Sequence, residues 1–183
     1  MFTAEEIRIA NATSRSNGAT ARGKDGVIKA IVPNFVYKNI DKHCSILDFG
    51  AGKDAIHTKW LKEQGFQNIT AYDFGENCIN GVHDANALNR QYDIIFASNV
   101  LNVNNSVNML AKTIDQIFLC LAPGGAFICN YPSSPRKIAV SSDYIKEIIE
   151  FTFDNKVKLV GGTKTAPLWK IIKPLSNSKE NSI

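Results

Sequence analysis

One short stretch limits the possible folds more than any other part of the sequence. Residues 45–54 read Ser-Ile-Leu-Asp-Phe-Gly-Ala-Gly-Lys-Asp, an apolar run followed by glycines at positions 50 and 52. Glycine permits the positive φ angles of a tight turn and lets a ligand lie against the backbone. We expect Asp54 to cap a helix that follows. This pattern is typical of a nucleotide-type pocket at the carboxyl edge of a parallel sheet.

A second apolar run, residues 68–73, ends in Asp73, about twenty residues after the glycines. An acid at this distance reaches the hydroxyl pair of a ribose. Three further pieces follow in order along the chain: Asp84-Ala-Asn86, Tyr92-Asp-Ile-Ile-Phe-Ala-Ser-Asn99, and Leu121-Ala-Pro-Gly-Gly-Ala-Phe-Ile-Cys129.

With these pieces in this order, the chain resembles the class I methyltransferases that use S-adenosylmethionine. The resemblance covers roughly residues 45–174. The chain is similar to the short methyltransferases found in phages and near DNA-modification systems. It implies an α/β, Rossmann-like methyltransferase fold, with a mostly parallel sheet and helices on both faces. It also implies S-adenosylmethionine as the cofactor.

Hydrophobic periodicity places the elements of this fold. Strands are expected at 45–49, 68–72, 93–97 and 126–130, helices at 54–63 and 107–121 and from about residue 142, and a terminal antiparallel hairpin at 157–160 and 168–172. Only residues 74–81 separate the second strand from the segment 82–84. The helix that the family places there must therefore be short or absent, with a minimal third strand. The pocket wall over the adenine is then thin, or is completed by another part of the chain.

The N-terminal part carries two helix signals. Thr3-x-x-Glu6 is a capping box and predicts a short helix. Residues 27–32 have helical spacing, and we expect Pro33 to end or kink that helix. The polar residues 11–26 make residues 1–26 a mobile N-terminal segment, and the tail 176–183 is expected to fray. We expect one methyltransferase domain over residues 1–183, without an appended target-recognition domain.

The resemblance assigns cofactor contacts residue by residue. It places Asp48 near the amino end of the cofactor, the backbone of Gly50, Ala51 and Gly52 against it, Asp73 on the ribose, Phe74 and the Asp84–Ala85 pair on the adenine, and Ser98, Asn99 and Val100 at the rim facing the acceptor. Arg22 and Lys24 could close over the cofactor carboxylate. The alternatives are ordinary ones: Asp48 stabilises the turn, Asp73 ends a strand, Asp84 belongs to a turn, and the two cations are solvated.

Candidate catalytic residues follow the fourth and fifth expected strands. They are Asn99, Asn130 and Tyr131. The segment 130–137 combines an amide, an aromatic ring and two cations, which suits a flat base beside a phosphate. The resemblance to the short methyltransferases found in phages and near DNA-modification systems makes nucleic acid the first expectation for the acceptor. His57 is interpreted as structural, whereas His83, beside Asp84, could line the pocket.

Composition excludes several classes. Of 183 residues 44% are hydrophobic, enough for a core, yet no apolar run approaches the length of a bilayer span. The start of the chain lacks a secretory signal pattern. Four scattered cysteines indicate free thiols in a reducing compartment, so a cytoplasmic location and no metal site are expected. A net charge of +4 is compatible with nucleic acid but also with many enzymes.

Three alternatives stay open. The chain could methylate a small molecule, or it could bind the cofactor without performing chemistry. A dinucleotide oxidoreductase begins with a similar turn, but such sites prefer glycine at the third position, where this chain has Asp54.

Overall fold

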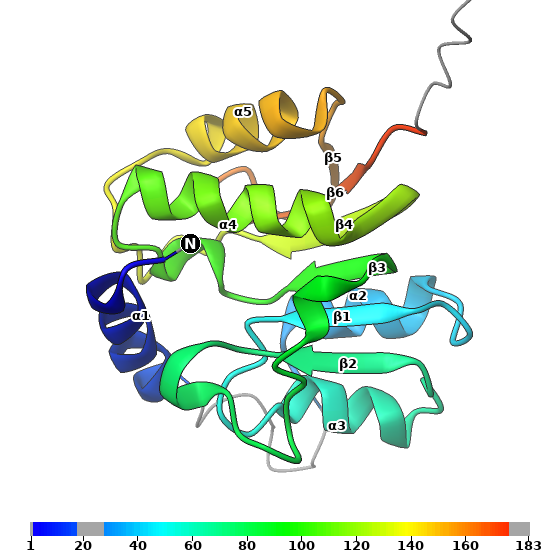
Figure 1. Ribbon diagram of the computed structural model, residues 1–183. Coiled ribbons are helices and arrows are strands. Elements are labelled where there is room, and N and C mark those ends of the chain that lie inside the picture. Colours follow the sequence, from blue (N-terminus) through cyan, green and yellow to red (C-terminus); the bar gives the residue numbers. More distant parts are fainter. Residues whose placement is uncertain (1, 18–27, 176–183) are drawn as a thin grey trace, which may run out of the picture.

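The structure is a computed structural model that describes residues 2–17 and 28–175. Its centre is a six-stranded sheet with the strand order β2-β1-β3-β4-β6-β5 (Figure 1). The strands are β1 (Ile46–Phe49), β2 (Ile69–Tyr72), β3 (Tyr92–Ala97), β4 (Leu121–Asn130), β5 (Lys158–Gly162) and β6 (Pro167–Ile172). Strands β1 to β4 are parallel, and β5 and β6 form an antiparallel pair beside β4. The expected fold class is confirmed.

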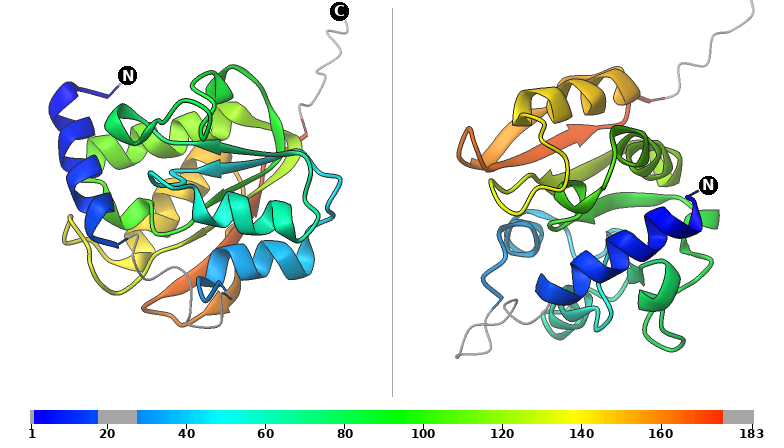
Figure 2. Two further views of the ribbon diagram at one scale, coloured as in Figure 1. Left: turned by 90° about the horizontal axis from the view of Figure 1, so that it is seen from below. Right: turned by 90° about the vertical axis from the view of Figure 1, so that its left-hand side faces the viewer.

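Four helices cover the two faces of the sheet (Figure 2). They are α2 (Ile31–Asn39) and α3 (Ile56–Glu63) on one face, and α4 (Val107–Cys120) and α5 (Ser142–Phe153) on the other. Successive side chains of a strand point to opposite faces. Ile46 therefore joins the core under α2 and α3, whereas Leu47 and Phe49 join the core under α4 and α5.

Side-chain caps begin two of these four helices, whereas Ala30 before α2 and Ala55 before α3 provide none. Ser106 caps α4 by accepting from the Met109 N–H, and Ser141 caps α5 in the same way. Helix α3 starts later than expected, at Ile56, after Ala55 in a left-handed conformation with φ of 44°. Asp54 is exposed and is not the capping residue, so that prediction was wrong. The turn that starts at the glycines therefore extends to residue 55, and the helix begins after it.

Pro33 does not end a helix, which corrects a second expectation. It lies in the first turn of α2, which continues to Asn39. A proline is tolerated there because the N–H groups of a first turn have no partner within the helix.

The connection after β2 is short, as predicted. A single 3₁₀ turn, η2 (Gly75–Asn77), takes the place of a helix. The segment 82–84 forms no strand in the structure. It contributes one isolated bridge between Asn80 and His83 and one hydrogen bond from the Asp84 N–H to the Ala71 carbonyl (3.0 Å). Strand β2 is therefore the edge of the sheet.

The N-terminal helix α1 (Ala4–Asn17) begins with the expected capping box. The Thr3 N–H donates to Glu6 Oε2 (2.7 Å), and the Glu6 N–H donates to Thr3 Oγ1 (3.1 Å). The helix is longer than predicted and includes part of the segment expected to be mobile. It lies beside η2 and the 3₁₀ turn η4 (Leu101–Val103), along the edge where the parallel strands end (Figure 1).

Candidate cofactor site

A cavity of about 370 Å³ lies at the carboxyl ends of β1, β2 and β3. Helices, strands and connections from several parts of the described chain contribute to its wall. The lining residues are Asn11, Lys29, Ala30, Phe49, Gly50, Ala51, Gly52, Ile56, His57, Asp73, Phe74, Asn77, Ser98, Asn99, Val100, Val103, Asn104, Met109 and Thr113. This is the edge at which the sequence predicted a nucleotide-type pocket.

The glycine turn forms the floor of the cavity. Gly50 and Gly52 have φ angles of +75° and +71°. A Cβ at Gly50 would lie 2.6 Å from Val100 Cγ2, whereas a Cβ at Gly52 would have no atom within 4 Å. The N–H groups of Gly50 and Ala51 both donate to the Tyr72 carbonyl (2.9 Å each). The turn thus offers a ligand backbone with the Ala51 methyl as its one side chain, while these two N–H groups anchor the turn to β2.

Asp73 joins the glycine turn to the next connection. Its Oδ2 accepts from the Gly52 N–H (2.7 Å), and its Oδ1 accepts from the Phe74 N–H (2.8 Å). Burial raises the pKa of Asp73, and these hydrogen bonds oppose that effect. The Asn77 side chain also bonds to Asp73. A carboxylate oxygen can accept more than one hydrogen bond. Asp73 therefore retains capacity for a further hydrogen bond, such as one from a ribose hydroxyl.

His83 supports the same turn from behind. Its Nδ1 accepts from the Ile79 N–H (3.0 Å), and its Nε2 lies 2.9 Å from the Gly52 carbonyl. Since Nδ1 is the acceptor, the proton is on Nε2, which donates to Gly52. His83 is buried and is not among the lining residues, so its place is structural.

Asp48 does not reach the cavity. It is 1% exposed, and its Oδ2 accepts from Thr58 Oγ1 (2.8 Å) on α3. Burial raises the pKa of Asp48 to about 7. The structure thus places Asp48 outside the cavity lining, where it holds α3 against β1. Its place near the amino end of the cofactor, directly or through water, stays a prediction.

The Asp84–Ala85 pair also lies away from the cavity lining. Asp84 forms an ion pair with Arg90 and accepts from the Asn86 N–H (2.8 Å), and Ala85 is exposed. The expected adenine contact therefore finds no support in their positions. Phe74 does line the cavity, and its ring stacks on Phe2 with 5.4 Å between centroids.

Of the three predicted catalytic residues, Asn99 alone lines the cavity. Its neighbours Ser98 and Val100, predicted at the rim, line the cavity as well. Asn130 lies behind it: the Asn99 N–H donates to Asn130 Oδ1 (2.8 Å), and Asn130 Nδ2 donates to Asn99 Oδ1 (2.7 Å). Tyr131 is fully buried, and its hydroxyl donates to the Val140 carbonyl (3.3 Å). Burial removes Tyr131 from the catalytic candidates, which corrects the prediction.

Sequence reasoning missed several lining residues with polar side chains, among them Asn11, Lys29 and His57. Lys29 precedes α2, Asn11 comes from α1, and His57 stands in the first turn of α3. The His57 Nε2 is buried without a hydrogen-bond partner in the structure, and burial lowers the pKa of His57 to about 4, so the ring is neutral. Its position one turn after the glycines could have identified it, because the first turn of such a helix faces the pocket. Arg22 and Lys24 lie outside the described residues.

The lining suits a sulfonium nucleoside. It combines one carboxylate, a glycine floor, an aromatic ring and apolar side chains. Two buried polar atoms in it, Ser98 Oγ and His57 Nε2, have no partner in the structure, and buried polar groups are normally hydrogen-bonded. A ligand with polar groups would satisfy them.

The comparison with protein families decides the assignment. The profile of a family described as a methyltransferase domain matches residues 21–155, more than half of the 183-residue chain. The chain belongs to this family. Its methyltransferases take the methyl group from S-adenosylmethionine, so the expected enzyme class and cofactor are confirmed. No curated protein matches the chain.

Solved methyltransferases share the fold at low identity. The magnesium protoporphyrin IX methyltransferase ChlM of Synechocystis PCC 6803, with bound SAH, is 12% identical with a TM-score of 0.57, over 94% of this chain and 89% of that chain. N-methyltransferase NodS of Bradyrhizobium japonicum WM9, in complex with S-adenosyl-l-homocysteine, is 13% identical with a TM-score of 0.56, over 91% and 99%. An O-methyltransferase family protein of Burkholderia thailandensis is 11% identical with a TM-score of 0.53, over 78% of this methyltransferase but only 55% of that chain.

No helix in residues 2–17 or 28–175 is both long and apolar enough to cross a bilayer. Within the same ranges, no three His, Cys, Asp or Glu side chains are grouped as a metal site would need.

Proposed function

We propose that this methyltransferase transfers the methyl group of S-adenosylmethionine to a small acceptor molecule. The observation that carries the proposal is the cavity wall, to which α1 and the start of α4 both contribute. The cavity volume of about 370 Å³ lies near the lower end of the range for small-ligand pockets. Helix α1, η4 and the start of α4 contribute lining residues, among them Asn11, Val103 and Met109. These walls favour a small acceptor over a polymer.

The cofactor-holding roles divide along the cavity. Asp73 would accept from a ribose hydroxyl, and Phe74 would pack against the adenine. The neutral His57 Nε2 would accept a hydrogen bond, and Lys29 would neutralise a carboxylate at the methionine end. When bound, S-adenosylmethionine supplies an electrophilic methyl carbon and a neutral thioether leaving group. The protein then has to bind and align the acceptor.

The lining also limits the chemistry of the acceptor. Of its described side chains, Asp73, Lys29 and His57 can titrate. Asp73 already accepts two backbone hydrogen bonds, and a histidine with a pKa of about 4 is poorly matched to remove a proton at neutral pH. An acceptor atom with a free lone pair at neutral pH, such as a weakly basic amine or an acidic hydroxyl, fits this site best. Asn99 would orient it by donating from its amide.

Nucleic acid, the first expectation from the sequence, lacks support in the structure. Arg136 from the 130–137 segment donates to the carbonyls of Pro132 and Thr165 (2.8 Å each) and lies 4.1 Å from the centroid of the Tyr131 ring. Its guanidinium therefore stabilises the loop. A phosphate would have to compete with these contacts.

Transfer of a labelled methyl group tests the proposal. The protein is incubated with methyl-tritiated S-adenosylmethionine and, separately, with a low-molecular-weight cell extract, pooled nucleic acids and pooled proteins. Label in the low-molecular-weight pool is the expected result. Label confined to nucleic acid or protein would overturn the small-acceptor proposal. No label in any pool, in spite of cofactor binding, would favour the binding module without chemistry.

The cysteines bear on the location of the protein. Cys44, Cys78, Cys120 and Cys129 are all free. Free thiols support the cytoplasmic location that we propose on the basis of the sequence.

A further inference from the structure

The adenine side of the cavity has an unusual construction. In the described chain, η2 is the only helical turn between β2 and the segment 82–84, and β2 is the edge of the sheet. The wall here cannot come from a helix in this connection. Helix α1 instead lies beside η2 (Figure 2), although it lies N-terminal to the part of the chain that the family profile matches, residues 21–155.

Asn11 makes the central contact between α1 and this connection. In the amide orientation that satisfies both neighbours, its side-chain nitrogen donates to the Phe74 carbonyl (3.1 Å) and its oxygen accepts from the Glu76 N–H (3.0 Å). Asn11 is 4% exposed and lines the cavity together with Phe74. One side chain of α1 thus holds the backbone on both sides of Gly75.

Gly75 shows how closely the two segments approach. Its φ is +62°, and a Cβ at this position would overlap the side chains of Ile7 and Asn11. The packing of α1 on η2 therefore requires glycine here, for the backbone conformation and for space. Gly81 has a similar φ of +80°, but a Cβ there would have no atom within 4 Å.

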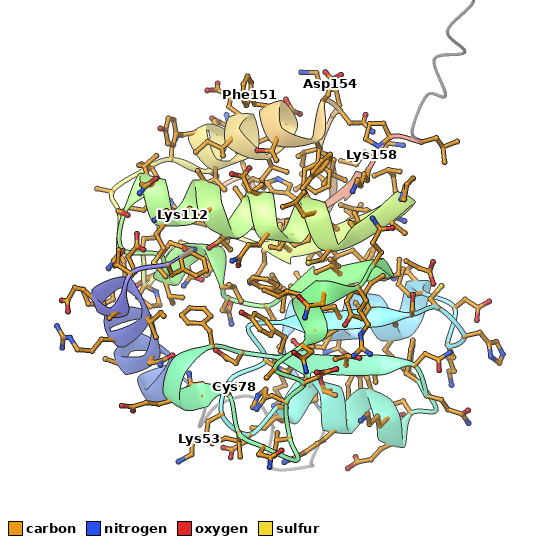
Figure 3. The ribbon with its side chains drawn as sticks, viewed as in Figure 1. Lys53, Cys78, Lys112, Phe151, Asp154 and Lys158 are labelled. Atoms are coloured by element: carbon orange, nitrogen blue, oxygen red, sulfur yellow. The ribbon has the colours of Figure 1, made fainter. Side chains whose placement is uncertain are left out.

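Two contacts hold the start of α1. Lys112 on α4 lies 3.3 Å from Glu6 Oε2, and Phe2 stacks on Phe74. Figure 3 labels Lys112 on α4 and Cys78 directly after η2, and α1 lies beside η2. Helix α1 thus spans from the acceptor-side helix α4 to the connection that carries Phe74.

We propose that α1 is part of the cofactor site and replaces the helix missing after β2. The adenine side is then bounded by Asn11 and the 74–77 connection, and Asp84 and Ala85 have no part in it. The inference rests on the proposed function, because it assumes that the cavity binds the cofactor. Docking of α1 and binding of the cofactor are then linked: each stabilises the other.

Calorimetry with S-adenosylhomocysteine tests the inference on the whole chain. Gly75→Ala should displace α1 and weaken binding about tenfold or more, because buried hydrogen bonds of Asn11 are lost. Gly81→Ala is the matched control, with similar backbone strain but no overlap, and should bind as the unmodified protein does. Asp84→Asn should also bind within about twofold, since Asp84 lies outside the lining.

Hydrogen exchange gives a second readout. Bound S-adenosylhomocysteine should slow exchange in residues 4–17 of the unmodified protein and much less in Gly75→Ala. If Gly75→Ala lowers the folded fraction, Asn11→Ala repeats the comparison, because it removes the two hydrogen bonds without introducing a steric overlap. Equal affinities of Gly75→Ala, Asn11→Ala and Gly81→Ala, or a large loss in Asp84→Asn, would overturn the inference. No binding to the unmodified protein would instead contradict the proposed function.

Discussion

Asn130 and Asn99 exchange two hydrogen bonds across the carboxyl ends of β4 and β3. Asn99 has a φ of 59°, a left-handed conformation that asparagine tolerates better than most residues. Asn130 accepts from the Asn99 backbone and donates to its side chain, so both the conformation and the amide orientation of Asn99 are fixed. Because Asn99 Oδ1 is engaged, the amide NH₂ is the part of Asn99 available to a ligand.

Loss of this pair should reduce stability. Asn130→Ala leaves the Asn99 N–H and Oδ1 without their partner, and we expect the free energy of unfolding to fall by about 1–3 kcal/mol. Urea denaturation measures the change. Asn108→Ala, at an exposed position of α4, is the control and should change the unfolding free energy by less than about 0.5 kcal/mol. Equal effects of the two substitutions would show that the pair is not stabilising.

The close approach of Gly50 and Val100 predicts a compensating pair of substitutions. Gly50→Ala should destabilise the fold, since its Cβ would meet Val100 Cγ2 at 2.6 Å and φ is +75°. Adding Val100→Ala removes the overlap but not the strain of the φ angle. The double variant should therefore regain part of the lost stability in thermal unfolding. A double variant that is no more stable than Gly50→Ala would contradict this account.

Asp48 should make stability fall as pH rises. Its folded-state pKa of about 7 lies above the ordinary value of 3.8, so the folded state binds more protons between these pH values. Unfolding free energy then decreases with pH across this window. Asp48→Asn removes that decrease while keeping an acceptor for Thr58. Measured by urea denaturation from pH 4 to 7, the variant should gain stability relative to the unmodified protein as pH rises. A constant difference would mean that Asp48 does not titrate as described.

His57 should act in the opposite direction. Its pKa is lowered by burial from 6.5 to about 4, so the unfolded state binds more protons between these values, and stability rises with pH there. His57→Gln should remove this rise. Relative to the unmodified protein, the unfolding free energy of the variant should be highest near pH 4, and this advantage should shrink by pH 6.5. The reverse trend would indicate that His57 is charged in the folded state.

The sheet was predictable because its signals are local. Apolar runs ending in Phe49, Tyr72 and Ala97, with glycines at positions 50 and 52, indicated parallel strands with a ligand edge, and the structure has them. The position of Asp73 in the cavity lining was predictable for the same reason, since it directly follows a strand that ends at this edge.

The remaining differences come from tertiary contacts that no local pattern reveals. Asp48 bonds to Thr58 and Asp84 pairs with Arg90, so both carboxylates face protein partners. Asn11 lies 63 residues before Phe74 in the sequence, and only the packing of α1 brings them together. A capping box predicted the start of α1 but could not predict what the helix covers.

The central claim is that the cavity binds a sulfonium nucleoside by its ribose at Asp73. Calorimetry of S-adenosylhomocysteine binding to the unmodified protein and to Asp73→Asn tests it most directly. We expect one site in the unmodified protein and an affinity about tenfold or more lower in the variant, as for a lost hydrogen bond to a charged group. No binding of S-adenosylhomocysteine, or equal affinity for both proteins, would contradict the claim.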